Sequence, residues 1–127
     1  MTKNLVILGS TGSIGTQALE VVDALGSIRV VGLAAGRSID RLEQQIRKYR
    51  PLAVAVTDLP AAEELKRRLL GESVRIFSGP GALEALARWE EADTVLVAVA
   101  GKVGLAPTLA AIRAGKTIAL ANKETLV

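Results

Sequence analysis

The sequence predicts an α/β fold, in which a doubly wound parallel sheet of about six strands carries helices on both faces. Hydrophobic residues make up 50% of the 127 residues, but aromatic residues only 2%. This composition is typical of buried parallel strands built from Val, Ile and Leu and covered by helices rich in Ala and Leu. Short β-branched runs alternate with amphipathic stretches, which is the pattern of right-handed βαβ crossovers. The length suits one core, so we expect one domain over residues 1–127.

The alternation defines the expected elements in order along the chain. The apolar, β-branched runs predict strands at Leu5–Leu8, Ile28–Leu33, Ala53–Val56, Val74–Phe77, Thr94–Val99 and Thr117–Leu120. The amphipathic stretches between them predict helices at Ile14–Leu25, Ile39–Tyr49, Ala61–Leu70, Ala82–Trp89 and Leu105–Ala114.

Glycine and proline mark the boundaries of these helices. Glycines stand where the first, third and fifth helices should end, at Gly26, Gly71 and Gly115. Pro51 ends the second helix. Prolines whose fixed φ suits entry into a helix stand at the starts of the last three, at Pro60, Pro80 and Pro107. These local signals agree with the periodicity.

Charge and composition exclude several classes of function. The net charge is +3, and 16 basic residues are interspersed among 13 acidic ones without a dense run. The few aromatic residues are far apart in sequence. A nucleic-acid surface usually combines clustered basic residues with aromatic residues that stack on bases, and this sequence shows neither feature. Cysteine and histidine are absent, which excludes disulfides, Ser-His and Cys-His catalysis and the commonest zinc ligands within this chain.

The start of the chain bears on localisation. The first strand begins almost at Met1 without a charged and then apolar leader, and no apolar run approaches the ~20 residues of a membrane span. We therefore expect a cytoplasmic protein with no membrane association.

The segment GSTGSIG, from Gly9 to Gly15, predicts a phosphate-binding loop between the first strand and the first helix. A helix that opens directly from a strand offers free N–H groups and the positive end of its dipole to a phosphate. Gly9 permits the tight turn, Gly12 permits close approach of the phosphate, and Gly15 permits close packing of helix on strand. Thr11 and Ser13 add hydroxyl groups. The alternative is a glycine-rich turn that only satisfies backbone geometry, but the βαβ context favours a Rossmann-like dinucleotide site.

The end of the second strand indicates which dinucleotide binds. A site for NAD usually places Asp or Glu here to accept hydrogen bonds from the ribose, and such a carboxylate would repel a 2′-phosphate. No acidic residue precedes Asp40; Arg37 and Ser38 stand at this position instead. A guanidinium and a hydroxyl suit a phosphate, which predicts NADP(H) rather than NAD(H). The alternative is an exposed arginine at the start of a helix.

Two later strand ends are also candidate parts of the site. We expect the carboxyl ends of the first, fourth and fifth strands to flank the cofactor crevice, with Ala98, Ala100 and Gly101 lining it. A plain tight turn is the alternative there. After the sixth strand come Asn122, Lys123 and Glu124, which offer an amide, an ammonium group and a carboxylate. The alternative is the polar first turn of an exposed helix.

Three segments together resemble one known family: GSTGSIG, AAGR at Ala34–Arg37 and LAPTLAAIRAGKTIALANKETLV at Leu105–Val127. The chain is similar over its full length to the N-terminal, NADPH-binding domain of the 1-deoxy-D-xylulose 5-phosphate reductoisomerase family. The resemblance implies an enzyme of isoprenoid biosynthesis that isomerises 1-deoxy-D-xylulose 5-phosphate and reduces the product with NADPH to 2-C-methyl-D-erythritol 4-phosphate. It also implies a magnesium, manganese or cobalt ion held by residues beyond Val127, and a homodimer for the full-length enzyme.

The resemblance also assigns roles to residues of this sequence. It implies that the cofactor phosphates contact Thr11, Gly12, Ser13 and Ile14. The 2′-phosphate end would be surrounded by Gly36, Arg37 and Ser38, where the family often has Lys-Asn in place of Arg37-Ser38. NADPH would also be held by Asn122 and Glu124, and the substrate would contact Lys123.

Other functions share the glycine loop. Aspartate-semialdehyde-type dehydrogenases need a cysteine nucleophile, which this chain lacks. Extended short-chain dehydrogenases use Tyr-x-x-x-Lys, whereas Ala53 stands four residues after Tyr49. A third alternative is a dinucleotide-binding module without catalysis. We expect the 127-residue chain to be inactive by itself if the catalytic residues lie elsewhere in a larger enzyme.

Overall fold

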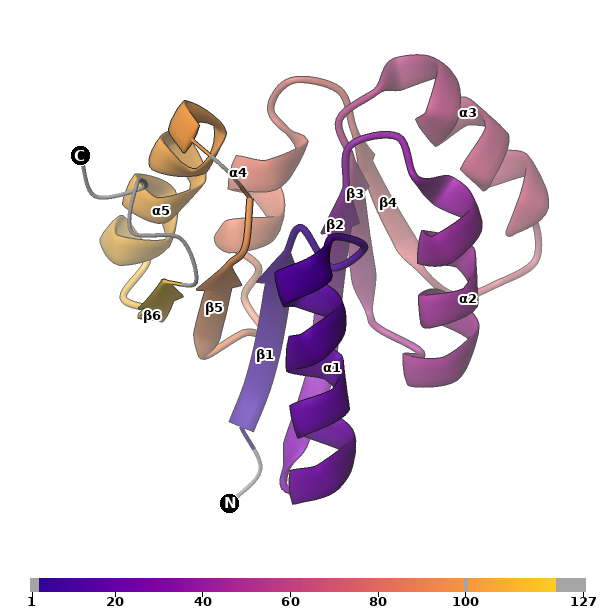
Figure 1. Ribbon diagram of the computed structural model, residues 1–127. Helices are drawn as coiled ribbons and strands as arrows, with labels where there is room; N and C mark the ends of the chain where they lie inside the picture. The colour runs from indigo at the N-terminus through magenta and orange to yellow at the C-terminus, as the bar shows by residue number, and fades with distance from the viewer. Residues whose placement is uncertain (1–2, 100, 121–127) are drawn as a thin grey trace.

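The structure is a computed structural model that describes residues 3–99 and 101–120. Strands and helices alternate along the described chain (Figure 1). The strands are β1 (Lys3–Leu8), β2 (Ile28–Ala35), β3 (Ala53–Val56), β4 (Arg75–Ser78), β5 (Thr94–Val97) and β6 (Thr117–Leu120). The helices are α1 (Ser13–Leu25), α2 (Ile39–Tyr49), α3 (Leu59–Arg68), α4 (Ala82–Ala87), the 3₁₀ turn η1 (Gly101–Gly104) and α5 (Leu105–Arg113).

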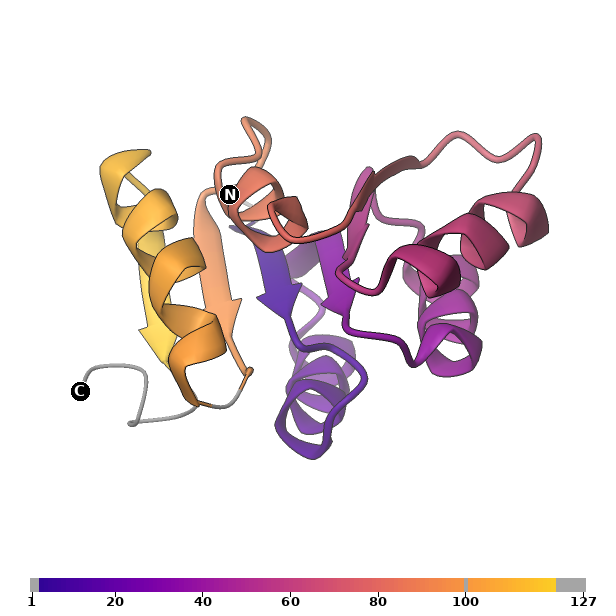
Figure 2. The ribbon, with the colours of Figure 1, turned by 90° about the horizontal axis from the view of Figure 1, so that it is seen from above.

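The strands form one parallel sheet in the order β4-β3-β2-β1-β5-β6. Figure 2 shows the same order from β6 on one side to β4 on the other. The chain therefore moves outward from β1 to β4, and then returns to the other side of β1 to form β5. This reversal confirms the predicted doubly wound sheet of about six strands.

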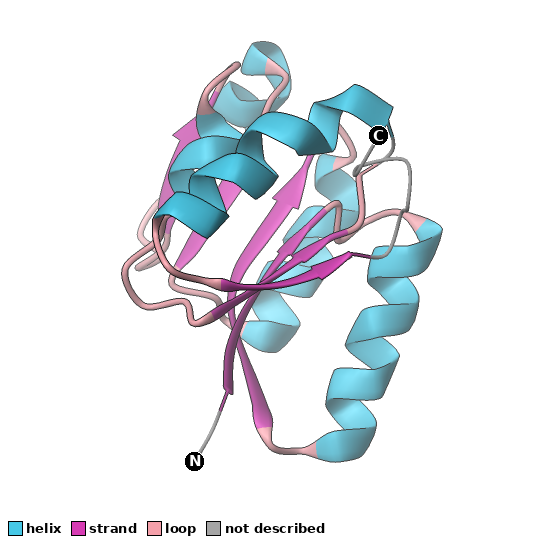
Figure 3. Ribbon diagram, turned by 90° about the vertical axis from the view of Figure 1, so that its left-hand side faces the viewer, coloured by secondary structure: helices cyan, strands magenta, loops and turns pink. Residues whose placement is uncertain are grey.

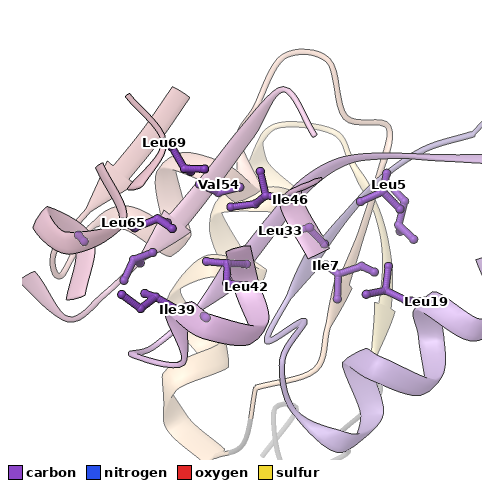
Figure 4. Packing of buried hydrophobic residues seen from close by; sticks show 14 of the residues in the cluster. Leu5, Ile7, Leu19, Leu33, Ile39, Leu42, Ile46, Val54, Leu65 and Leu69 are labelled. Carbon is purple, nitrogen blue, oxygen red and sulfur yellow. The ribbon is translucent and has the colours of Figure 1, made fainter. Parts of the chain in front are cut away.

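Helices cover both faces of the sheet, as Figure 3 shows. On one face, buried residues of α1, α2 and α3 pack against alternate residues of the strands, such as Ile7, Leu33 and Val54 (Figure 4). On the other face, α4 and α5 pack against Val6, Val95 and their neighbours. Parallel strands that are buried on both faces need apolar residues at every position. This burial explains why the strand sequences are continuous apolar runs.

Several predicted boundaries were wrong by a few residues. The third helix begins at Leu59, not at Ala61, because the Asp58 carboxylate caps it and accepts a hydrogen bond from the Ala61 N–H at 3.0 Å. The fourth helix ends at Ala87, before Trp89, and β5 ends at Val97 instead of Val99. The turn η1 was not predicted.

Candidate functional site

The candidate site lies at the carboxyl edge of the sheet, where β1 and β5 are neighbours. From β1 the chain leads into α1 on one face, whereas from β5 it leads toward α5 on the other face. The point where the strand order reverses is where open α/β sheets bind ligands. The expectation that the fourth strand flanks the site was wrong, because in the described part of the chain β4 pairs with β3 alone and forms the edge of the sheet, with β3 and β2 between it and β1.

Gly9 and Gly15 are required by the fold of the loop. Gly9 has a φ of +89°, and a Cβ there would lie 2.9 Å from the carbonyl oxygen of Ala98. A Cβ on Gly15 would overlap the Gly9 carbonyl oxygen and lie 2.7 Å from the Cα of Ser10. These glycines let the chain turn sharply after β1 and let α1 pack directly against the turn.

Gly12 has no such internal reason to be glycine. Its φ is −77° and its ψ 176°, an extended conformation that any residue adopts. A Cβ there would approach no atom more closely than the Gly9 carbonyl oxygen, at 3.7 Å. The residue is exposed. A side chain at position 12 would instead occupy the space in front of the helix start, which is where a phosphate would lie.

The loop offers unpaired donors at this same place. Among the described residues, no acceptor bonds the backbone N–H groups of Thr11, Ser13 and Ile14, and no side chain caps α1. The helix has 13 residues, so its aligned peptide dipoles end at these amides. Free amides, a positive dipole end and an open Gly12 fit a pyrophosphate group.

The loop is fixed to its neighbours by hydrogen bonds. The N–H groups of Gly9 and Ser10 donate to the Ala34 carbonyl oxygen of β2 at 3.1 and 2.9 Å. The fully buried Ser10 hydroxyl donates to Oε1 of Gln45 at 2.8 Å, and Nε2 of Gln45 donates to the Ser10 carbonyl oxygen at 2.9 Å. Gln45 was not among the predicted site residues. Its signal in the sequence is an amide three positions after Leu42, on the apolar side of an amphipathic helix.

The end of β2 lies beside this loop. Gly36, Arg37 and Ser38 follow the strand and are exposed, and the Gly36 carbonyl oxygen accepts a hydrogen bond from the Asp58 N–H at 3.0 Å. Gly36 lies close to Thr57: a Cβ added at Gly36 would lie 3.8 Å from the Thr57 Oγ1, which is an ordinary contact distance. The structure therefore brings the two predicted phosphate-binding segments together, one from β1 and one from β2.

The charges around Arg37 favour an anion. Asp40, the nearest carboxylate in sequence, lies 2.7 Å from Nη1 of Arg68 on α3. Asp58 caps α3 and does not pair with an arginine among the described residues. The Asp40 carboxylate and two glutamates raise the pKa of Arg68 above its ordinary value. Arg37 itself has no ion-pair partner in the described part of the chain.

A second arginine, which sequence reasoning missed, also reaches the loop. Nη1 of Arg41, in the first turn of α2, donates to the Thr11 carbonyl oxygen at 3.4 Å. The sequence carried one signal of it, a basic residue four positions after Arg37.

The remaining predicted residues divide into two groups. Ala98 lies against the loop, and its N–H donates to the Leu8 carbonyl oxygen at 2.8 Å; Gly101 begins η1 with a φ of +65°. The predictions for Ala100, Asn122, Lys123 and Glu124 fall outside the described residues.

Other features of the described residues do not add to this site. A hollow lined by Ile46, Arg50, Leu69 and Val74 lies at the opposite, amino-terminal end of the strands. Residues 3–99 and 101–120 contain no group of three or more Asp, Glu, His or Cys side chains placed to hold a metal ion. Within the same ranges, no helix combines the length and apolar character needed to cross a membrane.

Comparison with known proteins identifies the family. The family model for 1-deoxy-D-xylulose 5-phosphate reductoisomerase matches residues 5–127. The chain belongs to the 1-deoxy-D-xylulose 5-phosphate reductoisomerase family. This reductoisomerase assignment overturns the alternative of an aspartate-semialdehyde-type dehydrogenase.

Relatives within the reductoisomerase family are similar over nearly the whole chain. The enzyme of that name from Symbiobacterium thermophilum is 52% identical over an alignment of 132 residues, gaps included. The alignment covers 100% of this chain and 34% of the relative. The one from Agathobacter rectalis is 46% identical over 98% of this chain and 33% of its own. The chain thus spans about a third of the length of these relatives.

Solved reductoisomerase structures share the fold. The enzyme from Zymomonas mobilis in complex with NADPH superposes with a TM-score of 0.90 at 37% identity, over 99% of this chain and 33% of that chain. A reductoisomerase in complex with NADPH, fosmidomycin and magnesium gives a TM-score of 0.91 at 35% identity, over 98% of this chain and 31% of that chain.

Proposed function

We propose that residues 1–127 are the NADPH-binding domain of a 1-deoxy-D-xylulose 5-phosphate reductoisomerase. One observation supports this proposal above all: the two candidate phosphate-binding segments, after β1 and after β2, lie next to each other at the carboxyl edge of the sheet. Around the open Gly12, the backbone amides of Thr11, Ser13 and Ile14 have no acceptor among the described residues. Arg37 follows the neighbouring strand β2 and has no ion-pair partner among those residues. This arrangement suits the pyrophosphate and the 2′-phosphate of one dinucleotide.

The residues have distinct roles in this proposal. The α1 amides hold the pyrophosphate, and Ile14 and Ala98 border the crevice. Gly36 permits the ribose to approach the end of β2, and Arg37 and Ser38 bind the 2′-phosphate. Because Asp40, the nearest carboxylate in sequence, is paired with Arg68, it repels that phosphate less than a free carboxylate would. Bound NADPH supplies a hydride to the substrate.

The activity of the whole enzyme is part of the same proposal. By similarity to the family, the full-length protein isomerises 1-deoxy-D-xylulose 5-phosphate and reduces it to 2-C-methyl-D-erythritol 4-phosphate, in isoprenoid biosynthesis. The substrate oxygens are chelated by a magnesium, manganese or cobalt ion, whose ligands we place outside residues 1–127. We assign Lys123 to the substrate, and Asn122 and Glu124, with Ala100, to the cofactor. We further propose a cytoplasmic homodimer that binds neither nucleic acid nor membrane.

The experiment that tests the cofactor assignment is a titration of the 127-residue chain with NADPH and with NADH by calorimetry. We expect tighter binding of NADPH, and we expect Arg37→Ala to reduce that preference by about 1.5–3 kcal/mol, the value of a charge-assisted hydrogen bond. Arg88→Ala, which removes an exposed arginine on the opposite face of the sheet, is the control. Equal affinities of the wild-type chain for the two cofactors would refute the assignment.

A further inference from the structure

Arg41 holds an unusual position for an exposed arginine. It lies in the first turn of α2, and its Nη1 donates to the carbonyl oxygen of Thr11, in the glycine loop, at 3.4 Å. A neutral carbonyl at this distance is a weak partner for a guanidinium. Among the described residues, Arg41 has no carboxylate partner. Most of its five N–H groups therefore remain available.

The neighbouring carboxylates do not neutralise Arg41. Asp40, next to it on α2, is bonded to Arg68, and Glu43 is bonded to Arg47 and Arg68. Gln45, one turn further along α2, is neutral and engaged with Ser10. Within residues 3–99 and 101–120, α2 therefore presents to the loop a positive charge without a carboxylate partner, at Arg41, together with the bonded amide of Gln45.

Arg41 lies near both candidate phosphate-binding segments. A shallow surface pocket is lined by residues 37–41, so Arg37 and Arg41 share its wall. Arg37 follows the end of β2, and the hydrogen bond to Thr11 places the Arg41 guanidinium at the glycine loop. A phosphate in this pocket would have two guanidinium groups within its lining, and forked guanidinium groups suit phosphate oxygens.

We propose that Arg41 is a second determinant of cofactor specificity, which binds the 2′-phosphate of NADPH together with Arg37, from the side of the glycine loop. This inference rests on the proposed function, because it deepens the assignment of the same site. The contact with Thr11 places the guanidinium beside the glycine loop, and because this contact is weak it is readily exchanged for a phosphate oxygen. The same contact couples the loop that holds the pyrophosphate to the residue that selects NADPH.

The test is a titration of NADPH and of NADH, followed by cofactor fluorescence, on the wild-type chain and on Arg41→Ala, Arg41→Lys and Arg88→Ala. We expect Arg41→Ala to weaken NADPH binding about tenfold or more, the effect of losing a charged hydrogen bond, while NADH binding changes less than twofold. Arg41→Lys should recover part of the loss because it keeps the charge but not the fork. Arg88→Ala should bind both cofactors as the wild type does.

Three results would overturn the proposal. An equal loss for NADPH and NADH in Arg41→Ala would assign Arg41 to the pyrophosphate or to the shape of the loop. Unchanged binding of NADPH and NADH by Arg41→Ala would show that Arg41 is a surface charge with no role in cofactor binding. A loss of NADPH preference in Arg88→Ala as large as in Arg41→Ala would indicate a general charge effect. The proposed function fails separately, if the wild-type chain itself does not prefer NADPH.

Discussion

Ser10 and Gln45 form a reciprocal pair of hydrogen bonds that joins the glycine loop to α2. The Ser10 hydroxyl donates to Oε1 of Gln45 at 2.8 Å, and Nε2 of Gln45 donates back to the Ser10 carbonyl oxygen at 2.9 Å. Ser10 is fully buried, so these polar atoms have little access to water. The pair therefore connects the glycine loop to the helix that follows Gly36, Arg37 and Ser38.

Removing the Gln45 amide should weaken both the fold and the site. In Gln45→Ala the buried Ser10 carbonyl loses its side-chain donor, and the hydroxyl keeps only the Ala34 carbonyl, at 3.4 Å. We expect the free energy of unfolding to fall by about 1–3 kcal/mol, the cost of unsatisfied buried polar groups. NADPH affinity should also fall.

Urea denaturation and NADPH titration measure these effects. Gln44→Ala is the matched control, because Gln44 is the exposed neighbour on the same helix. If Gln45→Ala were as stable as Gln44→Ala and bound NADPH equally well, the pair would have no structural role in the site.

Substitutions of Gly12 and Gly15 should separate binding from folding. Gly12→Val should keep the fold, since the backbone there is extended and the nearest atom to a Cβ is 3.7 Å away. It should abolish NADPH binding, because the branched side chain fills the space of the pyrophosphate. Gly15→Ala should lose stability instead, because its Cβ would overlap the Gly9 carbonyl oxygen.

Thermal unfolding followed by circular dichroism, with NADPH titration, measures both effects. We expect Gly12→Val to unfold at nearly the wild-type temperature, and Gly15→Ala to unfold several degrees lower. Normal cofactor binding by a folded Gly12→Val variant would show that the loop is not the phosphate site.

Asp23 should make stability depend on pH in the acid range. Its carboxylate on α1 accepts hydrogen bonds from Lys48 and Tyr49 on α2, at 3.0 and 3.1 Å. The Lys48 hydrogen bond holds the pKa of Asp23 below its ordinary value. A lowered pKa stabilises the folded state above the unfolded value, which is about 3.9, and this stabilisation is lost as pH falls through the lower folded value.

Asp23→Asn should therefore be less stable than the wild type at pH 7, by a small amount because the pair is exposed. The difference should shrink as pH falls below the unfolded value of about 3.9, and it should disappear once the carboxyl of the folded wild type is protonated as well. Urea denaturation between pH 2 and 7 measures this, with Glu20→Gln as an equal charge change elsewhere on α1. A difference that stays constant over this range would contradict the role of the Asp23 charge.

The sequence by itself determined the class of fold, the number of strands and the position of the glycine loop between β1 and α1. Continuous apolar runs such as Ala53–Val56 identify strands buried on both faces, because no polar position interrupts them. Gly9 and Gly15 were predictable from spacing, since a turn from strand to helix has few solutions. The predicted helix Ile39–Tyr49 agrees with α2 at both ends, because its amphipathic period is strong.

Only the tertiary structure decided which strands meet and which side chains reach the site. Local periodicity carries no information on strand order, so the position of β4 at the sheet edge could not be read from the sequence. Gln45 and Arg41 reach the loop across 35 and 30 positions of sequence. Such contacts depend on how α2 docks against the turn after β1, which is set by the packing of the whole core and not by the residues around either position.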